Sequence, residues 1–499
     1  MDLFNPHFFV VTLALVGLVI IIAALLSGLI DRSDLPQVGV FLALGAVLGP
    51  AGLDLLNVTL QSPIVAVVAT LSLVLVLFTD AVSLSLAEIR RNGRLAFLVL
   101  GPGTLLTAAM VALIGWLLLG LAPAAAVILG AALASTDPIM LRGLIRRPGL
   151  AEPVRLALRL ESGLNDAVLL PIIFVAMPFL FHRGPPSGTE WARIGLEFFL
   201  LGPGAGIAVG LLGLSALDMI RRKVGVRRDY ESLYSLGIAF TAYAAAEAVH
   251  GSGFLAAFAA GLTIAALDVE LCDCFLEYGQ TTAEMALLFA FVLFGSSLIW
   301  SGFTVLNLPI LLFAIAVVLS RPIVFFLSLS GTRLDFRSRL LIAWFGPRGL
   351  SSLLLILLPV FAGATGSQQL FEISCFVVIL SVAVHGGSLM FLKRDSFPVP
   401  ARENVTVAAN DLPQDLQASA KPLENENLEA SALRISVSEL RRLQSSGAPI
   451  LILDVRRDRN FEASEFQAQG ALRISPDQPA QRIAELQIPR QTWLIAFCA

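Results

Sequence analysis

The chain has 499 residues, of which 57% are hydrophobic and only 14% are charged, and its formal net charge is −3. Soluble globular domains carry about 25% charged residues, so this composition excludes an ordinary soluble protein and indicates a membrane protein. The net charge says little about partners, and we expect no nucleic-acid partner. The four cysteines have no spacing typical of a disulfide framework.

Apolar runs fill most of residues 8–392, and the charges gather in short segments between them. A run of about 20 apolar residues can cross a bilayer as a helix, which satisfies its own backbone hydrogen bonds in lipid. We therefore predict an all-α polytopic membrane domain over residues 1–395, with about 13 transmembrane helices. Their predicted ranges are 8–30, 36–56, 62–82, 95–119, 122–141, 155–181, 191–218, 231–249, 252–267, 281–300, 304–330, 339–359 and 369–392. The first run is no obvious secretory signal, because it lacks a basic start and a small-residue cleavage site.

The loops between these helices alternate in charge. Basic residues follow the first, third, fifth, seventh, eleventh and thirteenth predicted helices, whereas the opposite loops hold only Arg183 and Arg193. By the positive-inside rule, we expect the N-terminus outside and the C-terminal tail in the cytoplasm, in a plasma or inner membrane. The predicted loop 268–280 is an exception, because it is acidic on the expected inner side.

Ionisable side chains inside membrane helices point to function, because each costs roughly 2.5–3.5 kcal/mol at the helix centre. The candidates are Asp80, Asp137, Glu161, Asp166, Glu247, Glu284, Arg321 and Arg348.

The fifth predicted helix ends in the run Ala134-Ser135-Thr136-Asp137-Pro138. Pro138 has no N–H for the carbonyl of Ala134, so we expect the helix to break or kink there. A break in mid-membrane exposes backbone carbonyls that can coordinate an ion. Thr136 can supply a hydroxyl or carbonyl ligand, and Asp137 can counter the positive start of the following helix. The alternative is a simple proline kink with Asp137 as its cap.

The sixth predicted helix carries the run Glu161-Ser162-Gly163-Leu164-Asn165-Asp166. Helical spacing places Glu161 and Asn165 on one face, and Ser162 and Asp166 on the adjoining face. Ser162 and Asp166 offer oxygen ligands of the kind that Na+ needs. Desolvation favours the neutral form of a buried carboxylate, so a proton and a cation can compete for Asp166. The alternative is that Asp166 only forms a buried salt bridge, with Arg321 or Arg348.

The eleventh and twelfth predicted helices carry the two arginines. We expect Arg321 to pair with Glu161 and to hold the sixth helix against the eleventh, although Arg348 is an open alternative partner for Glu161. The run Gly346-Pro347-Arg348-Gly349 interrupts the twelfth helix. Paired interruptions of this kind point to the binding site of a secondary transporter.

The motifs together resemble those of the monovalent cation:proton antiporter family of the NhaP/NHE type, over roughly residues 8–392. They are 134–138, 161–166, Ser252-Gly253-Phe254-Leu255-Ala256 and 346–349, in the family's order. The resemblance implies 13 helices with inverted repeats, two interrupted and crossing helices, and a homodimer. It also implies a core domain that moves like an elevator against a dimerisation domain.

The resemblance further implies residue roles. The aspartate matching Asp166 carries the cation or the proton, and residues matching Thr136 and Ser162 help to ligate the cation. An asparagine at the position of Asn165, rather than a second aspartate, is associated with electroneutral one-for-one exchange. The glutamate matching Glu161 pairs with an arginine, and that arginine matches Arg321. Gly163 departs from the family pattern by replacing a bulkier residue.

The composition becomes polar near residue 396, so we predict a linker over 396–432 and a small α/β domain over 433–499. The expected strands are Pro449–Val455 and Trp493–Phe497, the second followed by Cys498. This region resembles the start of a rhodanese-like domain, in which the thiolate matching Cys498 holds a persulfide at a helix N-terminus. Because the chain as given ends at Ala499, we expect this domain to be incomplete and inactive.

The sequence therefore predicts a transporter rather than an enzyme. It would exchange Na+, K+ or Li+ for H+ without a cofactor, with Na+ bound at Asp166 as the only metal. The alternative is a membrane-anchored sulfurtransferase or persulfide sensor, but an anchor needs one or two helices and no buried charges. A channel with the same fold is a third possibility, and a single buried carboxylate near a paired arginine favours alternating access over an open pore.

Overall fold

A computed structural model describes residues 37–84, 86–145, 147, 150–181, 187–224, 228–267, 273–332, 334–391, 450–455, 471–473 and 493–497, together with a few helical positions between 14 and 25. The chain divides into two units, Met1–Arg402 and Glu403–Ala499. The first unit is helical. The second contains a short sheet.

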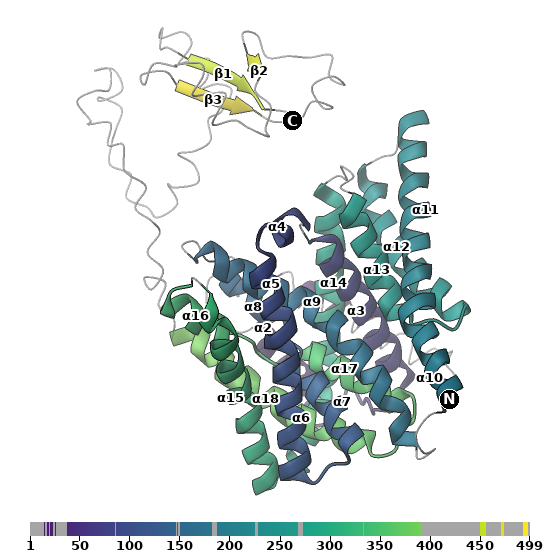
Figure 1. The fold of residues 1–499 in the computed structure, drawn as a ribbon, viewed down its shortest axis with the longest axis vertical. Coiled ribbons are helices and arrows are strands. Elements are labelled where there is room, and N and C mark those ends of the chain that lie inside the picture. The colour runs from purple at the N-terminus through teal and green to yellow at the C-terminus, as the bar shows by residue number, and fades with distance from the viewer. Residues whose placement is uncertain are drawn as a thin grey trace, which may run out of the picture. The chain divides into compact units, whose positions relative to one another are not determined.

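Two groups of helices make up the first unit (Figure 1). We call the first group the core bundle. It consists of α5 (Gly93–Leu98), η1 (Val99–Gly103), α6 (Thr104–Leu119), α7 (Pro123–Ala134), α8 (Pro138–Ile145), α9 (Glu152–Ala176), η2 (Met177–Phe181), α15 (Leu308–Ser328), η5 (Leu329–Gly331), α16 (Phe336–Trp344), α17 (Leu350–Phe361) and α18 (Ser367–Phe391).

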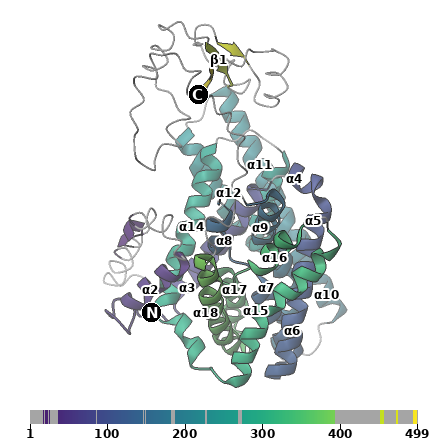
Figure 2. The same cartoon turned by 90° about the vertical axis from the view of Figure 1, so that its left-hand side faces the viewer.

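We call the second group the flanking bundle, and α4 (Leu86–Arg91) precedes α5 outside both groups. The flanking bundle consists of α2 (Gln37–Leu48), α3 (Pro63–Val82), α10 (Gly188–Gly195), η3 (Leu196–Leu201), α11 (Gly202–Lys223), α12 (Arg228–Ala248), α13 (Gly253–Leu267) and α14 (Asp273–Ser296). The short helix η4 (Leu298–Phe303) follows α14 and packs mainly against α18 of the core bundle. Figure 2 shows α2 and α3 beside α14. Small residues let these helices approach closely: a Cβ added at Gly206 of α11 would lie 2.1 Å from the carbonyl oxygen of Ala256 on α13.

Within the described residues, seven helical stretches are long and apolar enough to cross a membrane, and three shorter apolar helices accompany them. The fold is thus that of a mostly helical, polytopic membrane protein, as the composition predicted. The finer count of about 13 helices stays a prediction, and the first predicted helix, 8–30, lies largely outside the described residues.

Several predicted boundaries were wrong. The range 36–56 holds only α2, which ends at Leu48 ahead of Gly49-Pro50, because proline cannot continue the helical hydrogen bonds. The predicted acidic loop 268–280 is helical from Asp273, because α14 extends beyond its apolar stretch. The predicted helix 304–330 begins only at Leu308, where the side chain of Asn307 caps α15.

Both predicted interruptions are present. Between α7 and α8 the chain is not helical from Ser135 to Asp137, and Ser135 has an extended backbone. Between α16 and α17 it is not helical from Phe345 to Gly349. We refer to 135–137 as the first break and to 345–349 as the second break. We call the end of the unit where α8 ends and α9 begins the basic-loop end, after the basic residues around 142–155.

The second unit contains a parallel sheet with the strand order β2-β1-β3. Both predicted strands are present, as β1 (Ile450–Asp454) and β3 (Trp493–Phe497), and β2 (Leu472–Arg473) is a further strand. The predicted linker 396–432 and Cys498 lie outside the described residues, so the rhodanese-like assignment stays a prediction.

Candidate functional site: a buried charged cluster at two helix breaks

The two breaks lie against each other, although more than 200 residues separate them in the sequence. The backbone N–H of Asp137 donates a hydrogen bond to the carbonyl of Pro347 at 2.9 Å. Asp137 and Arg348 are each 1% exposed. Breaks of this kind leave helix ends with unpaired N–H and C=O groups inside the protein, and the charged side chains of the breaks satisfy several of them.

Asp137 caps two helices with one carboxylate. Its Oδ1 accepts hydrogen bonds from the N–H groups of Ile139 at 2.8 Å and Met140 at 3.3 Å, at the start of α8. Its Oδ2 accepts from the N–H of Leu350 at 2.8 Å, at the start of α17. A negative charge is stabilising at a helix N-terminus, so Asp137 serves both. Only glycine permits this approach, because a Cβ at Gly349 would lie 2.0 Å from Oδ2.

Arg348 performs the opposite task at the end of α7. Its Nη1 donates to the carbonyls of Ala134 at 2.8 Å and Ser135 at 3.1 Å. A positive charge is stabilising where helix carbonyls are unpaired. Each break therefore supplies a charged side chain to a helix end at the other break. The aspartate of the first break lies at the start of α17, and the arginine of the second break lies at the end of α7.

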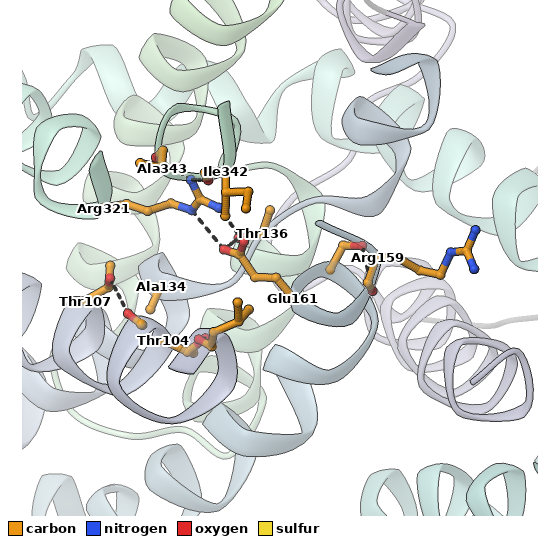
Figure 3. A network of polar contacts seen from close by, with 12 residues as sticks. Thr104, Thr107, Ala134, Thr136, Arg159, Glu161, Arg321, Ile342 and Ala343 are labelled. Atoms are coloured by element: carbon orange, nitrogen blue, oxygen red, sulfur yellow. Dashed lines mark hydrogen bonds and ion pairs between the residues drawn. The ribbon is translucent and has the colours of Figure 1, made fainter. Parts of the chain in front are cut away.

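Glu161 of α9 pairs with Arg321 of α15, and both side chains are about 2% exposed. Nε of Arg321 donates to Oε1 of Glu161 at 2.9 Å, and Nη2 bonds Oε2. Nη1 donates to the carbonyls of Ile342, at 2.7 Å, and Ala343, in the last turn of α16. Figure 3 shows the guanidinium between Glu161 and these carbonyls, with Thr136 on the other side of the carboxylate. The pair thus ties α9, α15 and α16 together, and Arg348 is not the partner of Glu161.

Asp166 lies about one and a half turns along α9 from the start of the motif and is 3% exposed. The hydroxyl of Ser135, in the first break, donates to its Oδ1 at 2.5 Å. The side chain of Ser351, in the first turn of α17, is a second hydrogen-bond partner. Hydroxyl groups from both interrupted helices therefore meet at one carboxylate, and no ion pair of Asp166 is present among the described residues.

Asn165 is fully buried, yet neither its Oδ1 nor its Nδ2 has a hydrogen-bond partner within the described residues. An unpaired buried polar group costs about 1–3 kcal/mol, and a hydrogen bond to water or a contact with an ion would offset that cost. Buried polar sites of this kind commonly hold water.

Two predicted cation ligands do not contact Asp166 in this conformation. The hydroxyl of Thr136 donates to Oε1 of Glu161 at 2.9 Å and accepts from Nη1 of Arg348 at 3.3 Å. The hydroxyl of Ser162 donates to the carbonyl of Arg159 at 3.4 Å, within its own helix. Both residues belong to the same cluster, but neither hydroxyl bonds directly to the carboxylate of Asp166.

Sequence reasoning missed Ser135 and Ser351. Helical spacing predicts neighbours within one helix, and neither serine lies on the helix of Asp166. Each is, however, a hydroxyl next to a predicted break, Ser135 beside Pro138 and Ser351 just after Gly349. Hydroxyl residues at both breaks were therefore a usable signal.

The charges of the cluster do not balance when all of its carboxylates are ionised. Of its ionisable side chains, three are acidic (Asp137, Glu161 and Asp166) and two are basic (Arg321 and Arg348). Asp137 and Glu161 have their charges matched by helix ends or by an arginine, which leaves Asp166 as the carboxylate with only hydroxyl partners. One bound proton or one monovalent cation makes the cluster neutral.

The transmembrane model of the sodium/hydrogen exchanger family matches residues 17–394. The chain is 25% identical over 386 residues to the K(+)/H(+) antiporter NhaP of Alkalimonas amylolytica, covering 76% of this chain and 65% of that protein. It is 28% identical over 378 residues to the K(+)/H(+) antiporter NhaP2 of Shewanella oneidensis, covering 74% and 64%. The match thus spans about two thirds or slightly less of the length of these relatives. The solved sodium proton antiporter NhaP1 of Methanocaldococcus jannaschii has a similar fold, with a TM-score of 0.61 at 21% identity over 75% of this chain and 98% of that chain.

Proposed function

Because the chain belongs to the sodium/hydrogen exchanger family, we propose that it is a secondary antiporter that exchanges a monovalent cation for a proton at Asp166. One observation carries the proposal. Asp166 is a buried carboxylate that receives hydroxyl groups from both interrupted helices and no arginine among the described residues. Such a carboxylate holds either a proton or a cation, and the two compete.

The charges of the cluster support one-for-one exchange. With Asp166 ionised, three carboxylates face two guanidinium groups, so one negative charge is uncompensated. An uncompensated charge buried in the membrane is costly, which disfavours movement of the site when it is empty. A proton or a cation at Asp166 removes that cost equally, so each can cross in exchange for the other with no net charge.

The identity of the cation follows from the chemistry of the ligands only in part. Carboxylate, hydroxyl and carbonyl oxygens suit hard cations, and Na+, K+ and Li+ are all of this class. The relatives described above are named as K(+)/H(+) and sodium proton antiporters. We propose Na+ or K+ as the substrate. Asp166, Ser135 and Ser351 would be its first oxygen ligands. Asn165 would be a positioning residue whose amide faces the bound ion or a bound water molecule.

Alternating access would come from movement of the core bundle against the flanking bundle, as secondary transporters commonly rock one bundle against another. The homodimer, the outside N-terminus, the cytoplasmic tail and the plasma or inner membrane remain proposals. The sulfurtransferase alternative is not favoured, because the family match falls on the membrane unit.

Cation-dependent collapse of a pH gradient tests the proposal directly. In inverted vesicles that hold a preformed ΔpH, adding Na+ or K+ should dissipate the gradient, and Asp166→Asn should abolish the response while the protein still inserts. Asp335→Asn is the matched control, because Asp335 caps the surface end of α16. Failure of Na+, K+ and Li+ to dissipate the gradient at acid, neutral and alkaline pH would refute antiport, and retained exchange in Asp166→Asn would place the site elsewhere.

A further inference from the structure

A partly exposed ion pair joins the two bundles. Arg142 of α8, in the core bundle, bonds Glu284 of α14, in the flanking bundle, and their side chains are 28% and 24% exposed. By contrast, the Glu152–Arg155 and Glu161–Arg321 pairs lie within the core bundle, and the Arg193–Glu197, Asp218–Arg222 and Arg221–Glu231 pairs lie within the flanking bundle. The Arg142–Glu284 pair is therefore placed to respond when one bundle moves against the other.

The pair lies close to the proposed cation site. Helix α8 begins directly after the first break, and at a rise of 1.5 Å per residue it carries Arg142 about 7 Å from Asp137 toward the basic-loop end. Asp80 of α3 lies near both Arg142 and Asp166, because its carboxyl group interacts electrostatically with each of them.

Gly163 shows where the bundles face each other. A Cβ added at Gly163 of α9 would lie 3.6 Å from Cβ of Asp80 and 3.8 Å from its Cγ. Gly163 precedes Asp166 by three residues, so the two share a face of α9. Asp166 thus lies about one turn from the point where α9 meets Asp80 of α3.

At the opposite end of α9, Phe174 stacks on Phe198 of η3 in the flanking bundle, with the ring centroids 4.4 Å apart. A cavity of about 400 Å³ lies there, lined by Phe174 of α9 and, from the flanking bundle, by Phe198, Tyr243, Glu247 and His250 among others. In this conformation the two bundles are thus joined by an ion pair at the basic-loop end, and by stacked aromatic rings beside a cavity at the other end.

We propose that Arg142 and Glu284 form a latch that closes the route to Asp166 from the basic-loop end and opens once in each transport cycle. The proposal rests on the proposed function, because only alternating access requires the route to open and close. A quarter-exposed ion pair contributes little stability and can break repeatedly, unlike the fully buried Glu161–Arg321 pair. On release, Arg142 can turn to Asp80, which avoids leaving its charge without a partner.

Accessibility of a reporter cysteine tests the latch without any transport measurement. The background replaces the four native cysteines and introduces Gly163→Cys, whose Cβ fits at ordinary contact distance from Asp80. In full-length protein in inverted vesicles, a small cationic methanethiosulfonate reagent reaches the cysteine from the basic-loop end. We expect Glu284→Gln and Arg142→Gln to raise the labelling rate about two- to fivefold, the population shift that loss of a weak ion pair can produce.

Two controls are available: a double variant that swaps the charges of Arg142 and Glu284, and a variant of another ion pair. The double variant Arg142→Glu with Glu284→Arg should restore the original labelling rate, whereas Glu231→Gln, which breaks the Arg221–Glu231 pair between α11 and α12 inside the flanking bundle, should leave it unchanged. An unchanged rate in both single variants, or an equal rise in Glu231→Gln, would overturn the latch. If labelling shifts as expected but the wild-type protein exchanges no cation, the proposed function fails instead.

Discussion

The carboxylate of Asp137 accepts a hydrogen bond from the backbone N–H of Leu350 at 2.8 Å, so the residue that ends the first break caps the helix that follows the second. The same carboxylate caps α8 through Ile139 and Met140. The two interrupted helices are thus fixed to each other by a side chain, and the position of Ser135 relative to Ser351, on either side of Asp166, depends on it.

Replacing Asp137 with alanine should therefore destabilise the protein and stop exchange. Three buried N–H groups would lose their acceptor, and each unpaired group costs about 1–3 kcal/mol. We expect a clearly lower melting temperature in detergent, measured by size-exclusion chromatography after heating, and no cation-dependent ΔpH collapse. The melting temperature of Asp137→Asn should lie between those of the wild type and Asp137→Ala, because the amide oxygen can still accept hydrogen bonds on one side.

Asp335→Ala is the control for a lost helix cap. Asp335 accepts from the N–H of Ser338 at 3.1 Å, and the side-chain and backbone hydrogen bonds of Ser338 hold the pKa of Asp335 below its ordinary value. It lies outside the cluster, so its loss should lower the melting temperature slightly and leave exchange intact. Equal stability of Asp137→Ala and Asp335→Ala would show that the shared cap is unimportant.

Gly346 should not tolerate a side chain. A Cβ there would lie 1.9 Å from Nε of Arg321, and the guanidinium cannot move aside without breaking its bonds to Glu161. Removing one partner of a buried ion pair costs about 3–5 kcal/mol, so Gly346→Ala should behave like Arg321→Met. We expect both to reduce the yield of folded protein severely, as judged by the monodisperse fraction after purification.

Gly387→Ala provides the comparison, because a Cβ at this position of α18 meets no atom within 4 Å. It should fold as the wild type does. A well-folded Gly346→Ala variant would mean that the Glu161–Arg321 pair has more freedom than its contacts indicate.

Much of the fold followed from composition and proline placement, since apolar runs and the residues Pro138 and Pro347 mark the helices and their breaks. The link from Glu161 to Arg321 was also predictable, because a buried arginine needs a carboxylate and Glu161 faces away from Asp166. The contact between Asp137 and Leu350 was not, because it depends on how two distant breaks are placed in space. For the same reason helical spacing predicted the hydroxyl of Ser162 as the neighbour of Asp166, whereas in the structure the hydroxyl of Ser135 bonds to it.

Ser135→Ala should shift exchange to higher pH and weaken cation binding. The hydroxyl of Ser135 stabilises the ionised form of Asp166, so its loss favours the protonated form and makes the proton harder to displace. A hydrogen bond to a charged group is worth about 1.5–3 kcal/mol, and we expect the pH of half-maximal exchange to rise by about one unit. The measurement is a pH profile of the cation concentration that gives half-maximal ΔpH collapse.

Ser374→Ala is a suitable control, because Ser374 is equally buried but donates only to the carbonyl of Leu370 in its own helix. Its pH profile should match that of the wild type. An unshifted profile in Ser135→Ala, with Ser351→Ala also unshifted, would exclude the two hydroxyls from the site.

Exchange should not respond to membrane potential. The five charged side chains of the cluster have a net charge of zero once a proton or a monovalent cation is bound. Neither half of the cycle therefore moves net charge across the membrane. In proteoliposomes whose potential is set with K+ and valinomycin, the rate of Na+/H+ exchange should be the same at inside-negative and zero potential. A full elementary charge crossing the membrane would feel about 2.3 kcal/mol per 100 mV, which corresponds to a rate change of up to about 50-fold and would be evident.

Asn165→Asp provides the positive control for this measurement. Asn165 is fully buried without a hydrogen-bond partner among the described residues, so a second carboxylate there would add a fourth acidic group to a cluster with two arginines. The site would then release more than one proton for each cation, and exchange should become dependent on potential if the variant folds. If the wild type depends on potential as strongly as Asn165→Asp does, one-for-one exchange is contradicted and a further titrating group is required. Asp80 of the flanking bundle, which faces Gly163 and interacts electrostatically with Asp166, would be the candidate.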